Sequence, residues 1–167
     1  MQCITIPDSV TAIGDFAFTG CSSLQKITIP KSVGTIGKAS FAGCFLLNIF
    51  SYNDRFIVYN NTFLIDKKEE RLIFCLSQLQ DILIPDFVTV IGDYAFSSYS
   101  SLRHISIPDS VTTIGDYAFS RCSSLQCISI PNSVTTIGER SFWVCSSLLQ
   151  IILPDSLSTI GNGMLDS

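Results

Sequence analysis

The chain has 167 residues, of which 47% are hydrophobic and only 14% are charged, and its net charge at neutral pH is −4. This length fits a single domain, and the high apolar content with few charges excludes an intrinsically disordered chain. The acidic balance without a basic patch argues against nucleic acid as a partner. A single histidine leaves little material for acid–base catalysis or for a metal site.

Targeting signals are weak in this sequence. The stretch from Met1 to Pro7 lacks a basic segment followed by a long apolar one, so we expect no signal peptide in this chain. The longest uncharged stretch, from Cys122 to Gly138, is interrupted by Ser, Thr, Pro and Gly. We therefore expect no membrane span.

An internal repeat dominates the sequence. The dipeptide Ile-Pro or Leu-Pro recurs every 23 residues, with one longer interval of 55 residues that holds two units. Stacked units of this kind share a continuous core, which predicts one solenoid domain over residues 1–167. The units are 1–23, 24–46, 47–78 (with an insertion), 79–101, 102–124, 125–147 and a partial 148–167.

Each unit begins with a predicted strand. In the unit 102–124, Leu102, Ile105 and Ile107 alternate with polar residues, which indicates a short strand with these side chains inward. Pro108 cannot donate to a β-ladder and ends the strand. Val111 and Ile114 then predict a second short extended segment.

A bend and a helical turn are expected to close each unit. Gly115 allows a sharp bend, and Asp116 is a natural N-cap for one helical turn that buries Ala118 and Phe119. Together with Ile105, Ile107 and Ile114 from the preceding segments, Phe119 should be almost fully buried.

The third unit departs from the repeat. It has nine extra residues, and Asn53 stands where the other units have proline. Two apolar runs between Thr62 and Phe74 flank the charged segment Asp66–Arg71, which predicts a β-hairpin. Its turn is interpreted as solvated, with a docking site as the alternative. The next unit carries Phe87 in place of Ser and Tyr99 in place of Cys.

The seven cysteines are interpreted as structural or exposed thiols. Four recur at one unit position along a line, whereas tetrahedral zinc needs ligands that converge on one point. Buried cysteine packs as a small hydrophobe, so these four are expected in the core, and Cys3 and Cys127 are expected to be exposed. The four core cysteines are Cys21, Cys44, Cys122 and Cys145.

Two interpretations of His104 are open. It forms a catalytic pair with Cys127, one coil away, or it is an exposed histidine that has no catalytic role. The pair would lie on an open sheet without a pocket or an oxyanion hole. We therefore expect no catalytic residues, no metal and no cofactor.

The repeat pattern Leu-x-x-Ile-x-Ile-Pro-x-Ser-Val-Thr-x-Ile-Gly-x-x-Ala-Phe-x-x-Cys-Ser-Ser resembles the 23-residue leucine-rich repeat of the BspA-like family. The resemblance implies a right-handed α/β leucine-rich-repeat solenoid with a concave parallel β-sheet, short helical turns and one hairpin insertion. It also implies a secreted or cell-surface protein that adheres to host matrix proteins and other cells.

The outward positions of the first strands form the predicted protein-binding face. Three of its residues are apolar where the repeat usually has polar ones, which marks a candidate interaction site; the alternative is that scattered exposed aliphatic residues are merely tolerated. The face comprises Lys26, Ile49, Asp81, Leu83, Arg103, His104 and Ile152.

Two function hypotheses follow. The first is a non-enzymatic protein-binding module of a cell-surface adhesin, and the alternative is an intracellular scaffold or signalling protein that uses the same face. The end units lack recognisable polar caps, so we also expect a tendency toward end-to-end self-association.

Overall fold

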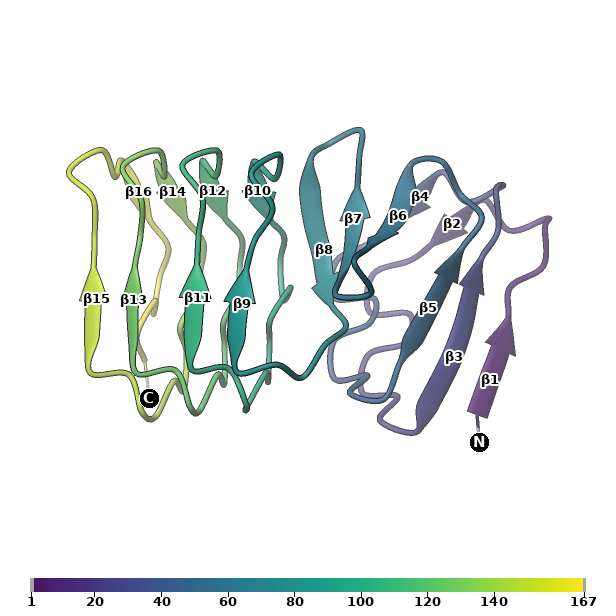
Figure 1. Ribbon diagram of the computed structural model, residues 1–167, viewed down its shortest axis with the longest axis horizontal. Helices are drawn as coiled ribbons and strands as arrows, with labels where there is room; N and C mark the ends of the chain where they lie inside the picture. Colours follow the sequence, from purple (N-terminus) through teal and green to yellow (C-terminus); the bar gives the residue numbers. More distant parts are fainter. Residues whose placement is uncertain (1, 167) are drawn as a thin grey trace.

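The computed structural model describes residues 2–166, which form sixteen β-strands and no helix. Figure 1 shows them wound as a solenoid whose regular coils each have a first and a second strand. The first strands are β1 (Gln2–Thr5), β3 (Leu24–Ile29), β5 (Asn48–Ser51), β9 (Asp81–Leu83), β11 (His104–Ser106), β13 (Cys127–Ser129) and β15 (Gln150–Ile152). The second strands are β2 (Ala12–Ile13), β4 (Thr35–Ile36), β10 (Val90–Ile91), β12 (Thr113–Ile114), β14 (Thr136–Ile137) and β16 (Thr159–Ile160).

Neighbouring coils pair in parallel, one repeat apart. Ile105 lies opposite Ile82 in the first strands, and Ile114 lies opposite Ile137 in the second strands. Equivalent apolar side chains therefore stack on one another along the solenoid, as the 23-residue period predicts.

The core is built from these stacked positions. Ile114 and Phe119 are completely buried and Ile107 is 9% exposed, which confirms the expectation for these three residues. The Phe119 ring stacks on Phe142 with centroids 5.3 Å apart. Ile105 is only half-buried, because a hollow opens beside its strand.

The expected helical turn is wrong, and the fold is all-β rather than α/β. Tyr94 and Ser98 have positive φ angles of 60° and 62°, and such left-handed residues end a helix. The backbone N–H of Phe96 instead donates to the carbonyl of Ala118 in the next coil, at 2.8 Å. Asp93 does not cap its own turn either, because its Oδ1 accepts the N–H of Asp116 at 2.9 Å.

The repeated glycine after each second strand permits close packing of coils. Gly115 does not have a positive φ, so the bend does not require glycine there. A Cβ at this position would lie 2.7 Å from the backbone nitrogen of Asp93 in the preceding coil. The approach of two backbones, rather than the expected sharp bend, explains this glycine.

The third unit forms the expected hairpin from β7 (Phe63–Asp66) and β8 (Arg71–Cys75), and β6 (Phe56–Tyr59) adds an antiparallel third strand. Side chains of the hairpin pack into two separate hydrophobic cores, one on each side of it. Phe63 packs in the core of the coils that follow, whereas Leu64 packs in the core of the coils that precede. The hairpin thus separates an N-terminal arm (residues 2–51) from a C-terminal arm (residues 79–166).

The third coil also changes the register of its first strand. Ile49 pairs with Ile27, and Asn48 pairs with Lys26. The partners are thus 22 residues apart instead of the 23 of the repeat, so the chain has one residue fewer between the first strands of the second and third coils. Ile49 therefore points into the core and is 6% exposed, and its expected place on the outward face is wrong. Phe50 takes the outward position instead.

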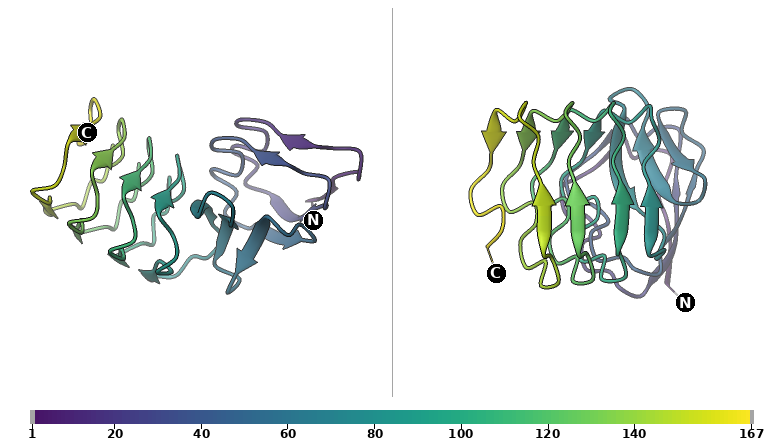
Figure 2. Two further views of the ribbon diagram at one scale, coloured as in Figure 1. Left: turned by 90° about the horizontal axis from the view of Figure 1, so that it is seen from above. Right: turned by 60° about the vertical axis from the view of Figure 1, so that its left-hand side comes forward.

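The solenoid bends at the hairpin. The second strands β16, β14, β12 and β10 continue through β8, β7 and β6 in one seven-stranded sheet, whereas the first strands fall into β1-β3-β5, β9-β11 and β13-β15. This sheet ends at β6, and β2 and β4 form a separate two-stranded sheet in the N-terminal arm. The first strands, expected to form a concave sheet, lie along the outer side of the bend instead (Figure 2).

A polar network anchors the hairpin to the N-terminal arm. The Asn53 amide donates to the Val33 carbonyl at 2.6 Å, in the place that proline has in other units. Asp66 is completely buried and accepts two hydrogen bonds from Arg55, at 2.8 and 2.7 Å. Arg55 also donates to the carbonyl of Gly34 at 2.8 Å. Lys67 to Glu70 are exposed, as expected of a solvated turn, whereas the two ends of the predicted charged segment, Asp66 and Arg71, are buried and half-buried.

Candidate functional site

The structure divides the predicted binding face between the two arms. Asp81 and His104 lie side by side on β9 and β11, with Leu83 two residues further along β9. Arg103 precedes β11 and is exposed. These four residues form one surface, which we call the β9–β11 face.

The other predicted residues lie apart from this face. Lys26 is in the N-terminal arm, where its ammonium group sits 4.8 Å from the centre of the Phe50 ring. Ile152 is on β15, in a separate sheet of the C-terminal arm, and is 53% exposed. Ile49 is buried and belongs to no surface.

Leu83 is the apolar centre of the β9–β11 face, since 71% of its surface is exposed. It lines a shallow hollow of about 570 Å³ between the end of β9 and the hairpin, together with Tyr59 and Phe87. The rings of Tyr59 and Phe87 meet edge to face with centroids 5.3 Å apart. Sequence reasoning noted Phe87 as a departure from the repeat but missed Tyr59, because its proximity depends on how the hairpin docks.

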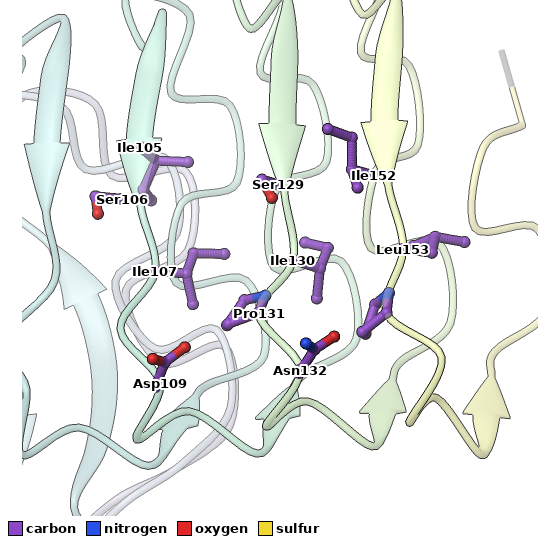
Figure 3. Close-up of a pocket in the computed structure, with 11 residues that line it drawn as sticks. Ile105, Ser106, Ile107, Asp109, Ser129, Ile130, Pro131, Asn132, Ile152 and Leu153 are labelled. Carbon is purple, nitrogen blue, oxygen red and sulfur yellow. The ribbon is translucent and has the colours of Figure 1, made fainter.

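Two further hollows follow along the corner at which each first strand reaches its proline. One is lined by Asp86, Ile107, Pro108, Asp109 and Ser110 and has a volume of about 430 Å³. The other, of about 560 Å³, extends from Ile105 to Leu153 (Figure 3). Figure 3 shows Asp109 and Asn132 along one margin, with Ile107 and Ile130 beside them.

The four cysteines that recur at one unit position contribute to packing rather than to reactive chemistry. The thiols of Cys44 and Cys145 donate to backbone carbonyls of the preceding coil, each at 3.0 Å. Burial raises the pKa of each of these two thiols to about 11, which keeps them protonated near neutral pH. Cys122 is buried and Cys21 is half-buried in the same row, as expected of packing residues.

The exposed thiols and the histidine stand on open strands. Cys3 and Cys127 are exposed, as the sequence predicts. His104 is exposed on β11, one coil from Cys127 on β13. Across residues 2–166, no group of three or more His, Cys, Asp or Glu side chains is arranged to hold a metal ion, and no helix is long and apolar enough to cross a membrane.

Comparisons with known proteins agree with the repeat and the fold. The model of the BspA-type leucine-rich repeat region matches residues 1–72 and 67–167. No curated protein matches the sequence significantly.

Solved structures of bacterial proteins are similar. A leucine-rich repeat protein from Eubacterium ventriosum is 31% identical with a TM-score of 0.79, over 89% of this chain and 41% of that one. The pneumococcal vaccine antigen PcpA is 27% identical with a TM-score of 0.79, over 96% of this chain and 47% of that one.

A leucine-rich cell surface protein from Faecalibacterium prausnitzii is 27% identical with a TM-score of 0.70, over 96% of this chain and 52% of that one. The chain thus spans about half the length, or less, of these three structures. Its repeats and its fold show that it belongs to the BspA-type leucine-rich repeat family.

Proposed function

We propose that the chain is a non-enzymatic protein-binding module of a cell-surface protein, and that its β9–β11 face contacts a host matrix or cell-surface protein. The observation that carries the proposal is the exposure of Leu83 between charged neighbours. A large exposed apolar residue within a polar rim is the arrangement of a binding hot spot. The similarity to a cell surface protein of Faecalibacterium prausnitzii supports the location.

An intracellular scaffold that uses the same face is the second candidate. All seven cysteines are free thiols, and reducing compartments keep thiols unpaired. Immunofluorescence on intact and on permeabilised cells that express the native full-length gene product separates the two candidates. Staining only after permeabilisation contradicts the surface location.

Binding itself is tested with immobilised extracellular-matrix proteins and soluble chain, measured by biolayer interferometry. Leu83→Asp and Arg103→Glu should each weaken the interaction about tenfold or more, because they disturb the centre and the rim of the face. Arg121→Glu is the matched control, since Arg121 is exposed in a turn outside this face and packs over Trp143. If both face variants bind as the unchanged chain does, the β9–β11 face is not the site.

A further inference from the structure

The three hollows adjoin one another along the hairpin and the C-terminal arm, and we treat them as one groove. The hollow beside the hairpin and the next one share Asp86, and the second and third share Ile107 and Asp109. The groove therefore runs from Tyr59 to Leu153, across the coils and along the proline that ends each first strand. We call it the proline-corner groove.

The floor of this groove is apolar. Ile107 and Ile130 form its buried part, with exposed fractions of 9% and 3%. Phe87 rises from the floor at the hairpin end, with 40% of its surface exposed, and Leu83 and Ile152 border it from the first strands. An apolar side chain of a partner would thus find contact at several points along the groove.

One wall carries uncompensated negative charge. Asp86 and Asp109 are exposed, and neither forms a salt bridge within residues 2–166. No lysine or arginine lines any of the three hollows. A partner with positive charge would therefore be attracted to this wall, and a phosphate- or sulfate-bearing polymer would be repelled.

We infer that the proline-corner groove binds an extended protein segment in which lysine or arginine alternates with apolar residues. Successive side chains of an extended chain point to opposite sides, so when the apolar set faces the floor the basic set faces away from it. The long stems of lysine and arginine let their charged ends bend back to the acidic wall. At about 4.8 Å per coil, the four coils and the hairpin cover roughly 20 Å, which about six extended residues span. This inference rests on the proposed protein-binding function and names the chemistry of the partner.

The probe is a fluorescein-labelled peptide of about ten residues in which lysine alternates with valine, together with a counterpart that has glutamate for lysine. Fluorescence anisotropy at low ionic strength should show binding of the lysine peptide only. The double variant Asp86→Asn with Asp109→Asn should weaken that binding about threefold to tenfold. Phe87→Ser, which restores the residue that the repeat usually has there, should weaken it as well.

The matched control removes the same charges from the same repeat position in a different part of the chain. Asp8→Asn with Asp54→Asn lies outside the groove and should leave binding of the lysine peptide unchanged. Equal weakening by the control pair, or equal binding of the glutamate peptide, overturns the inference. Concentration-dependent dimers that the Asp86/Asp109 variant abolishes also overturn it, because the occupant is then a second copy of the chain.

The same variants separate this inference from the proposed function. If Leu83→Asp and Arg103→Glu abolish binding of a matrix protein but Asp86→Asn with Asp109→Asn does not, the function stands and the groove is not the site. If the chain binds no protein of a panel that holds both matrix and cell-surface proteins, the proposed function fails, whatever the peptide does.

Discussion

Replacing Asp66 by asparagine tests how the hairpin is fixed in the solenoid. Its carboxylate is completely buried, accepts two hydrogen bonds from Arg55 at 2.8 and 2.7 Å, and accepts the N–H of Lys68 at 3.0 Å. The asparagine side chain would keep one acceptor oxygen but would face the guanidinium with an amide N–H. Because Arg55 remains 29% exposed and keeps its bond to Gly34, part of the loss is offset by solvent.

The expected loss is about 2–3 kcal/mol of unfolding free energy at pH 7, below the 3–5 kcal/mol typical of breaking a fully buried ion pair. For a chain of this size, that corresponds to a fall in melting temperature of roughly 5–10 °C. Urea unfolding followed by circular dichroism measures the free energy. Asp54→Asn, an exposed neighbour in the loop before the hairpin, is the control and should change stability by less than about 0.5 kcal/mol.

The pH dependence gives a second, independent measure. Burial alone would raise the pKa of Asp66, but hydrogen bonds from Arg55 and from backbone N–H groups outweigh it and hold the pKa below the ordinary value of 3.8. A carboxylate with a lowered folded-state pKa adds stability that is complete above the unfolded-state pKa and disappears as pH falls through the folded-state pKa. The difference between the unchanged chain and Asp66→Asn should therefore shrink below about pH 4. An equal difference at pH 7 and at pH 2 would refute this account of the anchor.

Four further predictions address the core, the coil contacts, the thiols and the ends. Phe119→Ala should cost about 3–5 kcal/mol in urea unfolding, because it leaves a cavity between Phe96 and Phe142; a loss below about 1 kcal/mol contradicts the stacked core. Gly115→Ala should cost about 1–3 kcal/mol, whereas Gly14→Ala, whose Cβ meets nothing within 4 Å, should be nearly neutral; equal effects would argue against close coil contact. Iodoacetamide at pH 8 should label Cys3 and Cys127 in the folded chain, and mass spectrometry that finds Cys122 labelled first would be incompatible with its burial. Sedimentation velocity should show association that rises with concentration, since Ile4 and Leu153 in the end coils are 36% and 39% exposed; a strict monomer contradicts this.

The sequence predicts the period, the burial of Ile107 and Ile114, and the hairpin correctly, because these follow from the recurrence of the unit and from the order of apolar and charged residues along the chain. It predicts the turns incorrectly for a reason visible at Asp93. An aspartate after glycine suits the N-cap of a helix, but here its oxygen accepts the N–H of Asp116 in the next coil. A pattern within one unit cannot distinguish a cap within the coil from a bond between coils.

The candidate site shows the same limit more sharply. Leu83 and His104 lie on the outer surface as the repeat positions predict, but Ile49 does not, because one residue fewer before β5 reverses the side that it faces. A register shift of one residue moves every side chain of a strand to the opposite face. Nor does the sequence indicate that Tyr59 reaches Phe87, since that contact depends on the docking of the hairpin.

The residues that break the repeat near the hairpin fall into two groups, and the difference bears on function. Asn53 replaces a proline and satisfies backbone carbonyls of the N-terminal arm, and Tyr99 replaces a cysteine, is 3% exposed and bonds to Ser77 at 3.1 Å. Packing against the hairpin explains both of them. Leu83 and Phe87 are 71% and 40% exposed at positions where the next two units have serine, so core packing does not require their apolar side chains. Exposed apolar surface that the fold does not need is the strongest indication in this chain that the β9–β11 face and the groove beside it bind a partner.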